Sequence, residues 1–115
     1  MNPLFTTATL HDFRVVEFQT SSLTNASELE RLSTALDILA GEQANGHILL
    51  DFTRVEYLSS QAIGMVVGLH KKVSGVAGGK LVLCGVGPQL MQLLKITRLD
   101  RLLKVVKTQK DVAGC

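Results

Sequence analysis

Two adjacent serines, Ser59 and Ser60, are the side chains of this sequence best placed to do regulated chemistry. They follow a continuous apolar run at residues 48–50, which is typical of a strand buried on both faces of a sheet. After them, apolar residues recur at the three- and four-residue spacing of one helix face: Ile63, Val66, Val67 and Val73. A serine hydroxyl at the start of a helix can cap the helix, or it can accept a phosphate. The stretch therefore predicts a buried strand that leads to two hydroxyls at a helix N-terminus, a geometry that suits a switch.

Asp51, in the strand predicted over residues 48–52, is a second residue whose place suggests chemistry. A buried strand with such an aspartate also occurs in phospho-aspartate receiver domains. That class needs an acidic pair after the first parallel strand and a lysine at the end of a later strand. Here residues 19–21 read Gln-Thr-Ser, and Lys80 begins a strand instead of ending one. We therefore expect Asp51 to support the structure by accepting hydrogen bonds from loop amides.

The sequence contains none of the common catalytic or ligand-binding motifs. It has no P-loop, no dinucleotide-binding glycine motif, no nucleophile-elbow motif and no zinc-protease helix motif. The histidines His11, His47 and His70 lie far apart in sequence, and no histidine and cysteine spacing resembles a zinc site. The sequence therefore predicts a protein that is not an enzyme, with no cofactor and no metal site.

Composition predicts one globular domain over residues 1–115, with 46% apolar and 19% charged residues and a net charge of +2. There is no basic stripe and no tryptophan, so binding to nucleic acid is not expected. No apolar run approaches the length of about 20 residues that spans a membrane. We expect a cytoplasmic protein without membrane association; the sequence leaves a monomer and a weak dimer both open.

The order of the predicted elements favours an α/β fold with a mixed four- to five-stranded sheet and about four helices. The sheet would combine an N-terminal antiparallel hairpin with a parallel core. The expected strands cover residues 4–10, 13–18, 48–52, 80–85 and 102–106. The expected helices begin near Asn25 or Ser27, at Ser60 and at Gly87–Pro88, with a last helical turn at residues 108–113.

Three glycines carry local predictions. Gly41 is expected to end the first helix. Gly64 and Gly68 lie inside the second helix, where each glycine costs about 1 kcal/mol relative to alanine. That cost suggests that this helix approaches the sheet, or a partner, too closely for a side chain.

Three separated segments resemble the STAS domain family, and within it the stand-alone anti-sigma factor antagonists of bacteria. The segments read I-L-L-D-F-T-R-V-E-Y-L-S-S-Q-A-I-G-M-V-V-G-L-H-K-K, G-G-K-L-V-L-C-G-V-G-P and L-L-K-I-T-R-L-D-R-L-L-K-V. In the family, a strand ending in aspartate, here Asp51, leads to a helix that begins D-S-S-G-L-G. The resemblance covers most of the chain and implies the STAS fold.

The resemblance also implies a regulatory cycle. In the family, an anti-sigma factor with serine kinase activity phosphorylates the first serine of D-S-S-G, and a phosphatase removes the phosphate. The unmodified domain binds the kinase and displaces the sigma factor, and the phosphorylated domain releases the kinase. Alignment on Gly64 places the phosphorylatable serine at Ser60, with Ser59 as the weaker alternative; a third interpretation makes both serines purely structural caps.

The sequence departs from the family motif at three positions of the helix start. Ser59 stands where the family has aspartate, Gln61 replaces the second serine, and Ala62 replaces the first glycine. The segment that often reads G-E-L-D is Gln-Thr-Ser-Ser at residues 19–22. An interaction module that is not switched, working as a scaffold in a larger signalling complex, is therefore the alternative function.

The partner-binding surface is expected where the helix start meets the loop at residues 20–25, because both should lie at the same edge of the sheet. Its predicted residues are Ser59, Ser60, Gln61, Ala62 and Gly64, with Ser21, Ser22, Thr24 and Asn25 from the loop.

Overall fold

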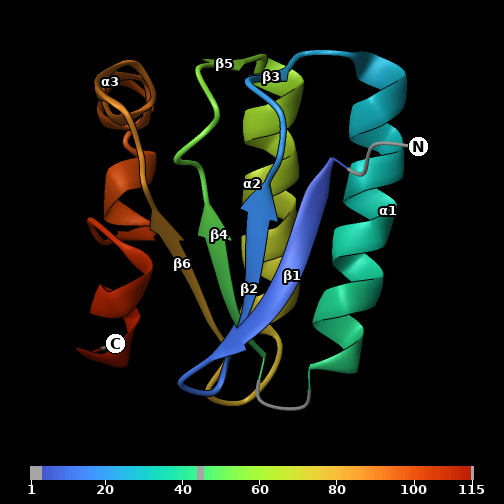
Figure 1. Cartoon of the computed structure of the whole chain (residues 1–115), viewed down its shortest axis with the longest axis vertical. Coiled ribbons are helices and arrows are strands. Elements are labelled where there is room, and N and C mark those ends of the chain that lie inside the picture. Colours follow the sequence, from blue (N-terminus) through green and yellow to red (C-terminus); the bar gives the residue numbers. More distant parts are fainter. Residues whose placement is uncertain (1–3, 44–45, 115) are drawn as a thin grey trace.

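The computed structural model describes residues 4–43 and 46–114. The elements, in chain order, are β1 (Phe5–Leu10), β2 (Phe13–Phe18), β3 (Ser22–Leu23), α1 (Ala26–Glu42), β4 (His47–Asp51), β5 (Tyr57–Leu58), α2 (Ser60–Ser74), β6 (Lys80–Cys84), α3 (Pro88–Ile96), η1 (Leu99–Arg101), β7 (Lys104–Val105) and η2 (Gln109–Gly114). Here η denotes a 3-10 helix. The prediction of an α/β fold with a mixed sheet is confirmed (Figure 1).

The main sheet has five strands in the order β1-β2-β4-β6-β7. Only β1 runs antiparallel to its neighbour; β2, β4, β6 and β7 are parallel to one another. His11 and Asp12, both with positive φ, form the two-residue turn between β1 and β2. Positive φ at both central residues is the geometry whose twist matches a β-hairpin, so the predicted hairpin is confirmed.

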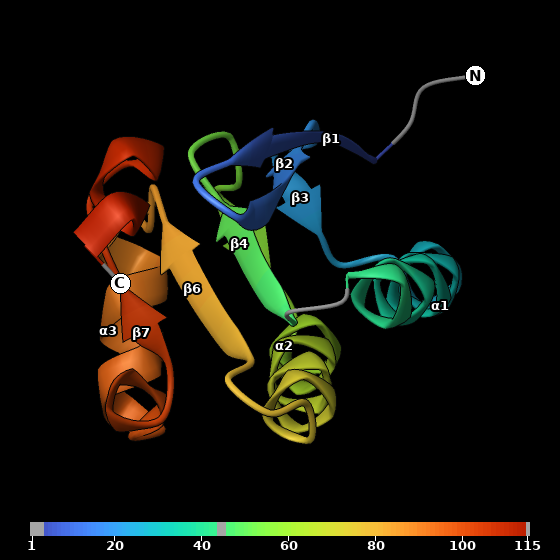
Figure 2. The same cartoon turned by 90° about the horizontal axis from the view of Figure 1, so that it is seen from below.

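Each face of the sheet is covered by a separate group of apolar side chains. On one face, buried residues of β2, β4 and β6 pack against α1, α2 and α3; α1 and α2 lie side by side there (Figure 2). On the other face, Val15, Leu49, Val82 and Cys84 pack against Val112 of η2. Burial on both faces explains why the central strands read as continuous apolar runs.

The helices differ from the sequence prediction in two details. Helix α1 continues through Gly41 to Glu42, so the prediction that Gly41 ends the helix is wrong. The main-chain N–H of Gln43 bonds to the Leu39 carbonyl, which extends the ladder past the glycine. The predicted last helical turn at residues 108–113 is the 3-10 helix η2.

A second, two-stranded sheet was not predicted. Strands β3 and β5 each contain two residues and pair in parallel, Ser22 with Tyr57 and Leu23 with Leu58. Two-residue strands carry no hydrophobic periodicity, so the sequence offered no signal for them. This small sheet joins the loop before α1 to the loop before α2 (Figure 1).

Candidate functional site

The two serines at the start of α2 differ in role. Ser59 is the N-cap residue, with extended backbone at φ −91° and ψ 168°. Its Oγ accepts a hydrogen bond from the Ala62 N–H at 3.2 Å and donates to the Leu23 carbonyl at 3.4 Å. Ser59 is half-buried, and its two hydrogen bonds hold the start of α2 against β3.

Ser60 is the first residue of α2, and its side chain is exposed. Within residues 4–43 and 46–114 its hydroxyl makes no hydrogen bond. No acidic residue lies in the first turn of the helix, so the positive end of the helix dipole is not neutralised there. The Ser60 hydroxyl is thus accessible, unengaged and placed where a negative charge would be favourable.

Main-chain hydrogen bonds join the loop at residues 20–25 to the segment that leads into α2. The Ser21 carbonyl accepts from the N–H groups of Glu56 at 2.8 Å and Tyr57 at 3.0 Å, and the Leu23 carbonyl accepts from the Ser59 N–H at 3.1 Å. The side-chain amide of Gln61 also donates to the Ala26 carbonyl of α1 at 3.3 Å. The two segments therefore form one surface at the N-terminal ends of α1 and α2, at the top of Figure 1.

The loop residues predicted for this surface lie beside Ser60's helix start. Ser21 and Thr24 are exposed, and the Thr24 and Ser22 hydroxyls are 2.8 Å apart. Asn25 caps α1 by accepting a hydrogen bond from the Glu28 N–H at 3.0 Å, which confirms the predicted helix start there.

Ala62 is a correction to the predicted surface. Its side chain is 0% exposed and packs in the core, so it cannot contact a partner. It contributes only its N–H, which bonds to Ser59.

Gly64 and Gly68 do not serve internal packing. A Cβ added at either position would meet no described atom within 4 Å, and both glycines are exposed on α2. The prediction of a close approach inside the molecule is therefore wrong. The other half of that prediction, a close approach by a partner, stays a prediction.

Tyr57 is a residue of this surface that was not predicted from the sequence. It lies in β5, two residues before Ser59, and is 59% exposed. Together with Glu56 it borders a hollow of about 430 Å³ that reaches Pro88 and Gln89 at the start of α3. A single tyrosine in an otherwise polar turn was the available signal, because exposed aromatic side chains are enriched where proteins bind partners.

A carboxylate cluster below this surface fixes the loop after β4. Asp51 Oδ1 accepts hydrogen bonds from the N–H and hydroxyl of Thr53, and Oδ2 accepts from Gln109 Nε2 at 2.7 Å. Gln109 Nε2 also donates to Glu17 Oε1 at 2.7 Å, and Glu17 pairs with Asp51 across β2 and β4. The predicted supporting role of Asp51, accepting from a loop amide, is thus present in the structure.

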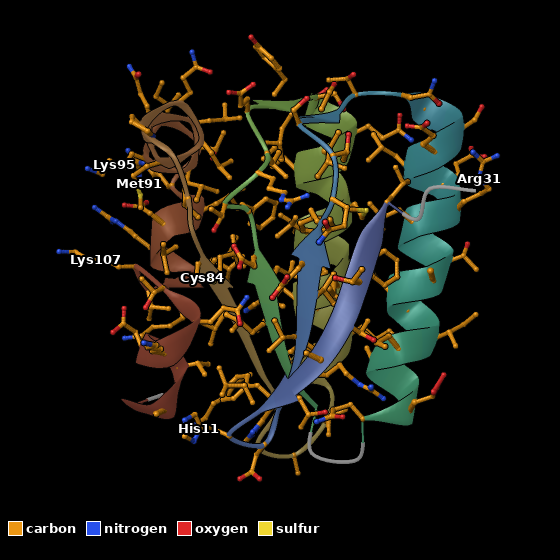
Figure 3. All side chains as sticks on the ribbon, viewed as in Figure 1. His11, Arg31, Cys84, Met91, Lys95 and Lys107 are labelled. Carbon is orange, nitrogen blue, oxygen red and sulfur yellow. The ribbon has the colours of Figure 1, made fainter. Side chains whose placement is uncertain are left out.

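Burial opposes ionisation of Asp51, but the hydrogen bonds from Thr53 and Gln109 outweigh it, so the pKa of Asp51 lies below its ordinary value of 3.8. The pKa of the neighbouring Cys84 thiol, which is labelled in Figure 3, is shifted in the opposite direction. Burial, and then the charge of Asp51, raise the pKa of Cys84 to about 12. Cys84 is therefore a neutral core residue at physiological pH. In the described part of the chain, no three His, Cys, Asp or Glu side chains are arranged to hold a metal ion.

The chain belongs to the STAS domain family, whose model matches residues 8–113. Solved structures with the same fold include a protein from Thermotoga maritima described as a candidate anti-sigma factor antagonist. Its TM-score is 0.81 at 22% identity, with 96% of this chain and 92% of that chain covered. An anti-sigma-factor antagonist (STAS) domain protein from Planctomyces limnophilus gives 0.80 at 20% identity, covering 96% and 94%.

The phosphorylated form of SpoIIAA, a Bacillus cell fate determinant, superposes with a TM-score of 0.72 at 17% identity and covers 96% of both chains. At such identities the similarity shows a shared fold. No helix within residues 4–43 and 46–114 is long and apolar enough to cross a membrane.

Proposed function

We propose that this protein is an anti-sigma factor antagonist of a bacterial signalling pathway. It binds an anti-sigma factor that is also a serine kinase, and phosphorylation of Ser60 switches that binding off. A phosphatase restores the binding form, and the cycle runs in the cytoplasm. The observation that carries the proposal is the accessible Ser60 hydroxyl at the first position of α2, beside the surface formed by the loop at residues 20–25.

The environment of Ser60 favours a switch that changes the interface more than the fold. A phosphate on Ser60 would carry a charge of about −1.5 to −2 at the positive end of α2, where anions are stabilised. No acidic residue in the first turn would repel it. A partner packed against the same surface would have to desolvate that charge, which is costly unless a cation pairs with it. Phosphorylation should therefore weaken binding and leave the domain folded.

The structure of the helix start favours Ser60 over Ser59 as the phosphate acceptor. Ser59 Oγ is half-buried and already bonds to Ala62 and Leu23, so modification there would break the helix cap. Ser59 also occupies the place of the family's aspartate, and both residue types are good N-caps. The substitution thus preserves the local structure of the motif while removing one negative charge beside Ser60.

The test is phosphorylation of the purified protein by its partner kinase and ATP, followed by intact-mass measurement. We expect one added phosphate in the wild type and none in Ser60→Ala. Ser74→Ala is the matched control, because Ser74 is an exposed serine at the other end of the same helix and should leave phosphorylation unchanged. Retention of the phosphate in Ser60→Ala would refute the assignment.

The alternative function is a STAS scaffold that binds its partner without a phosphorylation switch. It is favoured by the departures at Ser59 and Gln61, since Gln61 here bonds to Ala26 of α1 and helps to fix the surface. Binding of the partner to wild type, Ser60→Ala and Ser60→Asp separates the two functions. The switch requires Ser60→Asp alone to bind more weakly, whereas the scaffold requires equal affinity for all three.

A further inference from the structure

The two edges of the main sheet are protected to different degrees. At one edge, β7 contains only two residues; the first of them is the exposed Lys104, and the exposed Lys107 follows shortly after the strand. The other edge is β1 (Figures 1 and 2), which contains six residues with no charge and no proline. The four central side chains of β1 are exposed. Short edge strands with lysines resist pairing with another chain, whereas a long uncharged edge invites it.

The register of the hairpin shows which main-chain N–H and C=O groups of β1 are available to bond to another strand. The Gln19 N–H donates to the Leu4 carbonyl at 2.7 Å, and the two-residue turn closes at Leu10 and Phe13. Hydrogen-bonded pairs alternate along an antiparallel ladder. Residues 4, 6, 8 and 10 therefore bond to β2, and the N–H and C=O groups of Phe5, Thr7 and Thr9 point away from the sheet. In the described part of the chain no other strand pairs with them.

We infer that β1 is a self-association edge, on which a second copy of this chain adds its own β1 in antiparallel orientation. The three outward-facing residues are spaced symmetrically about Thr7. A two-fold axis at Thr7 therefore matches Thr7 with the partner's Thr7, and Phe5 with the partner's Thr9. Each of the three matched pairs can exchange two main-chain hydrogen bonds, and the result is one continuous sheet through both copies.

A second copy of the chain fits this edge better than an unrelated strand does, because the outward-facing N–H and C=O groups of β1 match those of another β1. Closed two-fold interfaces require one patch that matches its own copy, and this centred set of donors and acceptors satisfies that condition. Threonine pairs directly across an antiparallel ladder also contribute favourable contacts. The paired area is one strand from each copy, so the dimer is expected to be weak and to form as concentration rises.

The edge and the Ser60 surface are on different elements, so self-association does not depend on the proposed function. The test is sedimentation velocity from micromolar to millimolar protein. We expect a monomer that converts to a dimer in the wild type. Thr7→Lys places two lysines directly opposite each other at the axis and should weaken the dimer by about fivefold. Ala8→Lys is the matched control, because its exposed side chain would face the partner's Thr6 and not itself.

Amide hydrogen exchange supplies a second measurement that identifies the strand. The N–H groups of Phe5, Thr7 and Thr9 should gain protection with concentration, whereas those of Thr6 and Ala8 are protected by β2 at every concentration. A wild type that stays monomeric at millimolar concentration would overturn the inference. So would a dimer weakened equally by Thr7→Lys and Ala8→Lys, or protection that appears only when a different protein is added.

Discussion

Gln109 holds two carboxylates in place, and replacing it with glutamate tests how far the sheet depends on that contact. One Gln109 side-chain amide nitrogen donates to Glu17 and to Asp51, each at 2.7 Å. Gln109→Glu keeps the size of the side chain but removes both donated hydrogens and adds a third carboxylate. We expect the variant to be substantially less stable than the wild type at neutral pH.

The size of the effect follows from the two contacts. A hydrogen bond to a charged group contributes about 1.5–3 kcal/mol, and because Glu17 and Asp51 are only half-buried, water can replace part of it. We expect the loss of both contacts to cost about 2 kcal/mol, which Gln109→Ala measures. Like-charge repulsion at an effective dielectric constant of about 20 should raise the total for Gln109→Glu to about 4 kcal/mol. In a domain of 115 residues, each kcal/mol lowers Tm by about 4 °C.

The assay is urea unfolding followed by circular dichroism, because the chain has no tryptophan. In the wild type the pKa of Asp51 is lower in the folded state than its ordinary 3.8. The stability that Asp51 supplies is therefore fully present above 3.8 and is lost as the pH falls below it. In Gln109→Glu the crowded carboxylates have raised pKa values in the folded state, so acidification from neutral pH should recover stability. Between neutral pH and pH 3.8, acid should therefore stabilise Gln109→Glu and leave the Asp51 contribution of the wild type unchanged; the wild type should lose that contribution only at lower pH.

Gln92→Glu is the matched control, because Gln92 is exposed on α3 and makes no side-chain hydrogen bond within the described residues. It should change the free energy of unfolding by less than about 0.5 kcal/mol. If Gln109→Glu is as stable as Gln92→Glu at neutral pH, or if acid does not restore its stability, the reasoning about this cluster is refuted.

Two further predictions concern Ser59 and Cys84. Ser59→Ala removes the cap of α2 and should lower the free energy of unfolding by about 1 kcal/mol. Ser59→Asp keeps a capping oxygen and should retain the wild-type stability. An equal loss of stability in Ser59→Asp would show that the hydrogen bond from the Ser59 hydroxyl to Leu23, and not the cap, stabilises the start of α2. In a Cys115→Ser variant, which leaves one cysteine, Cys84 should not react with a thiol reagent in the folded protein at pH 8, because it is buried and its pKa is raised to about 12. It should react in urea, and rapid labelling of this variant without urea would contradict the burial of Cys84.

Much of the fold could be predicted from residue patterns. The predicted N-terminal hairpin, the apolar run at residues 48–50 and the predicted helix start at Ser60 each correspond to an element of the structure. The small sheet of β3 and β5 could not be predicted, because two residues form no periodic pattern. The extent of α1 was also misjudged, because Gly41 is tolerated inside a helix when its neighbours keep their hydrogen bonds.

The candidate site was predictable only as a set of residue types. Sequence placed two hydroxyls at a helix start, but it left open which hydroxyl is engaged. The structure resolves their environments, since Ser59 bonds to Ala62 and Leu23 while Ser60 is exposed. The burial of the Ala62 side chain and the exposure of Tyr57 likewise could not be predicted from the sequence, because each depends on which residues from distant segments pack nearby.

The sequence by itself determined the longer strands and helices, the parallel core and the family to which the chain belongs, because these follow from local periodicity and from motifs that are contiguous in the chain. Only the tertiary structure decided how Asp51, Glu17 and Gln109 meet, since Gln109 is 58 residues from Asp51 and 92 from Glu17. It also decided that the loop before α1 and the start of α2 form one surface, and that β1 lies at an unprotected edge. Hydrogen bonds between segments far apart in the chain are set by packing of the whole domain, which no local pattern encodes.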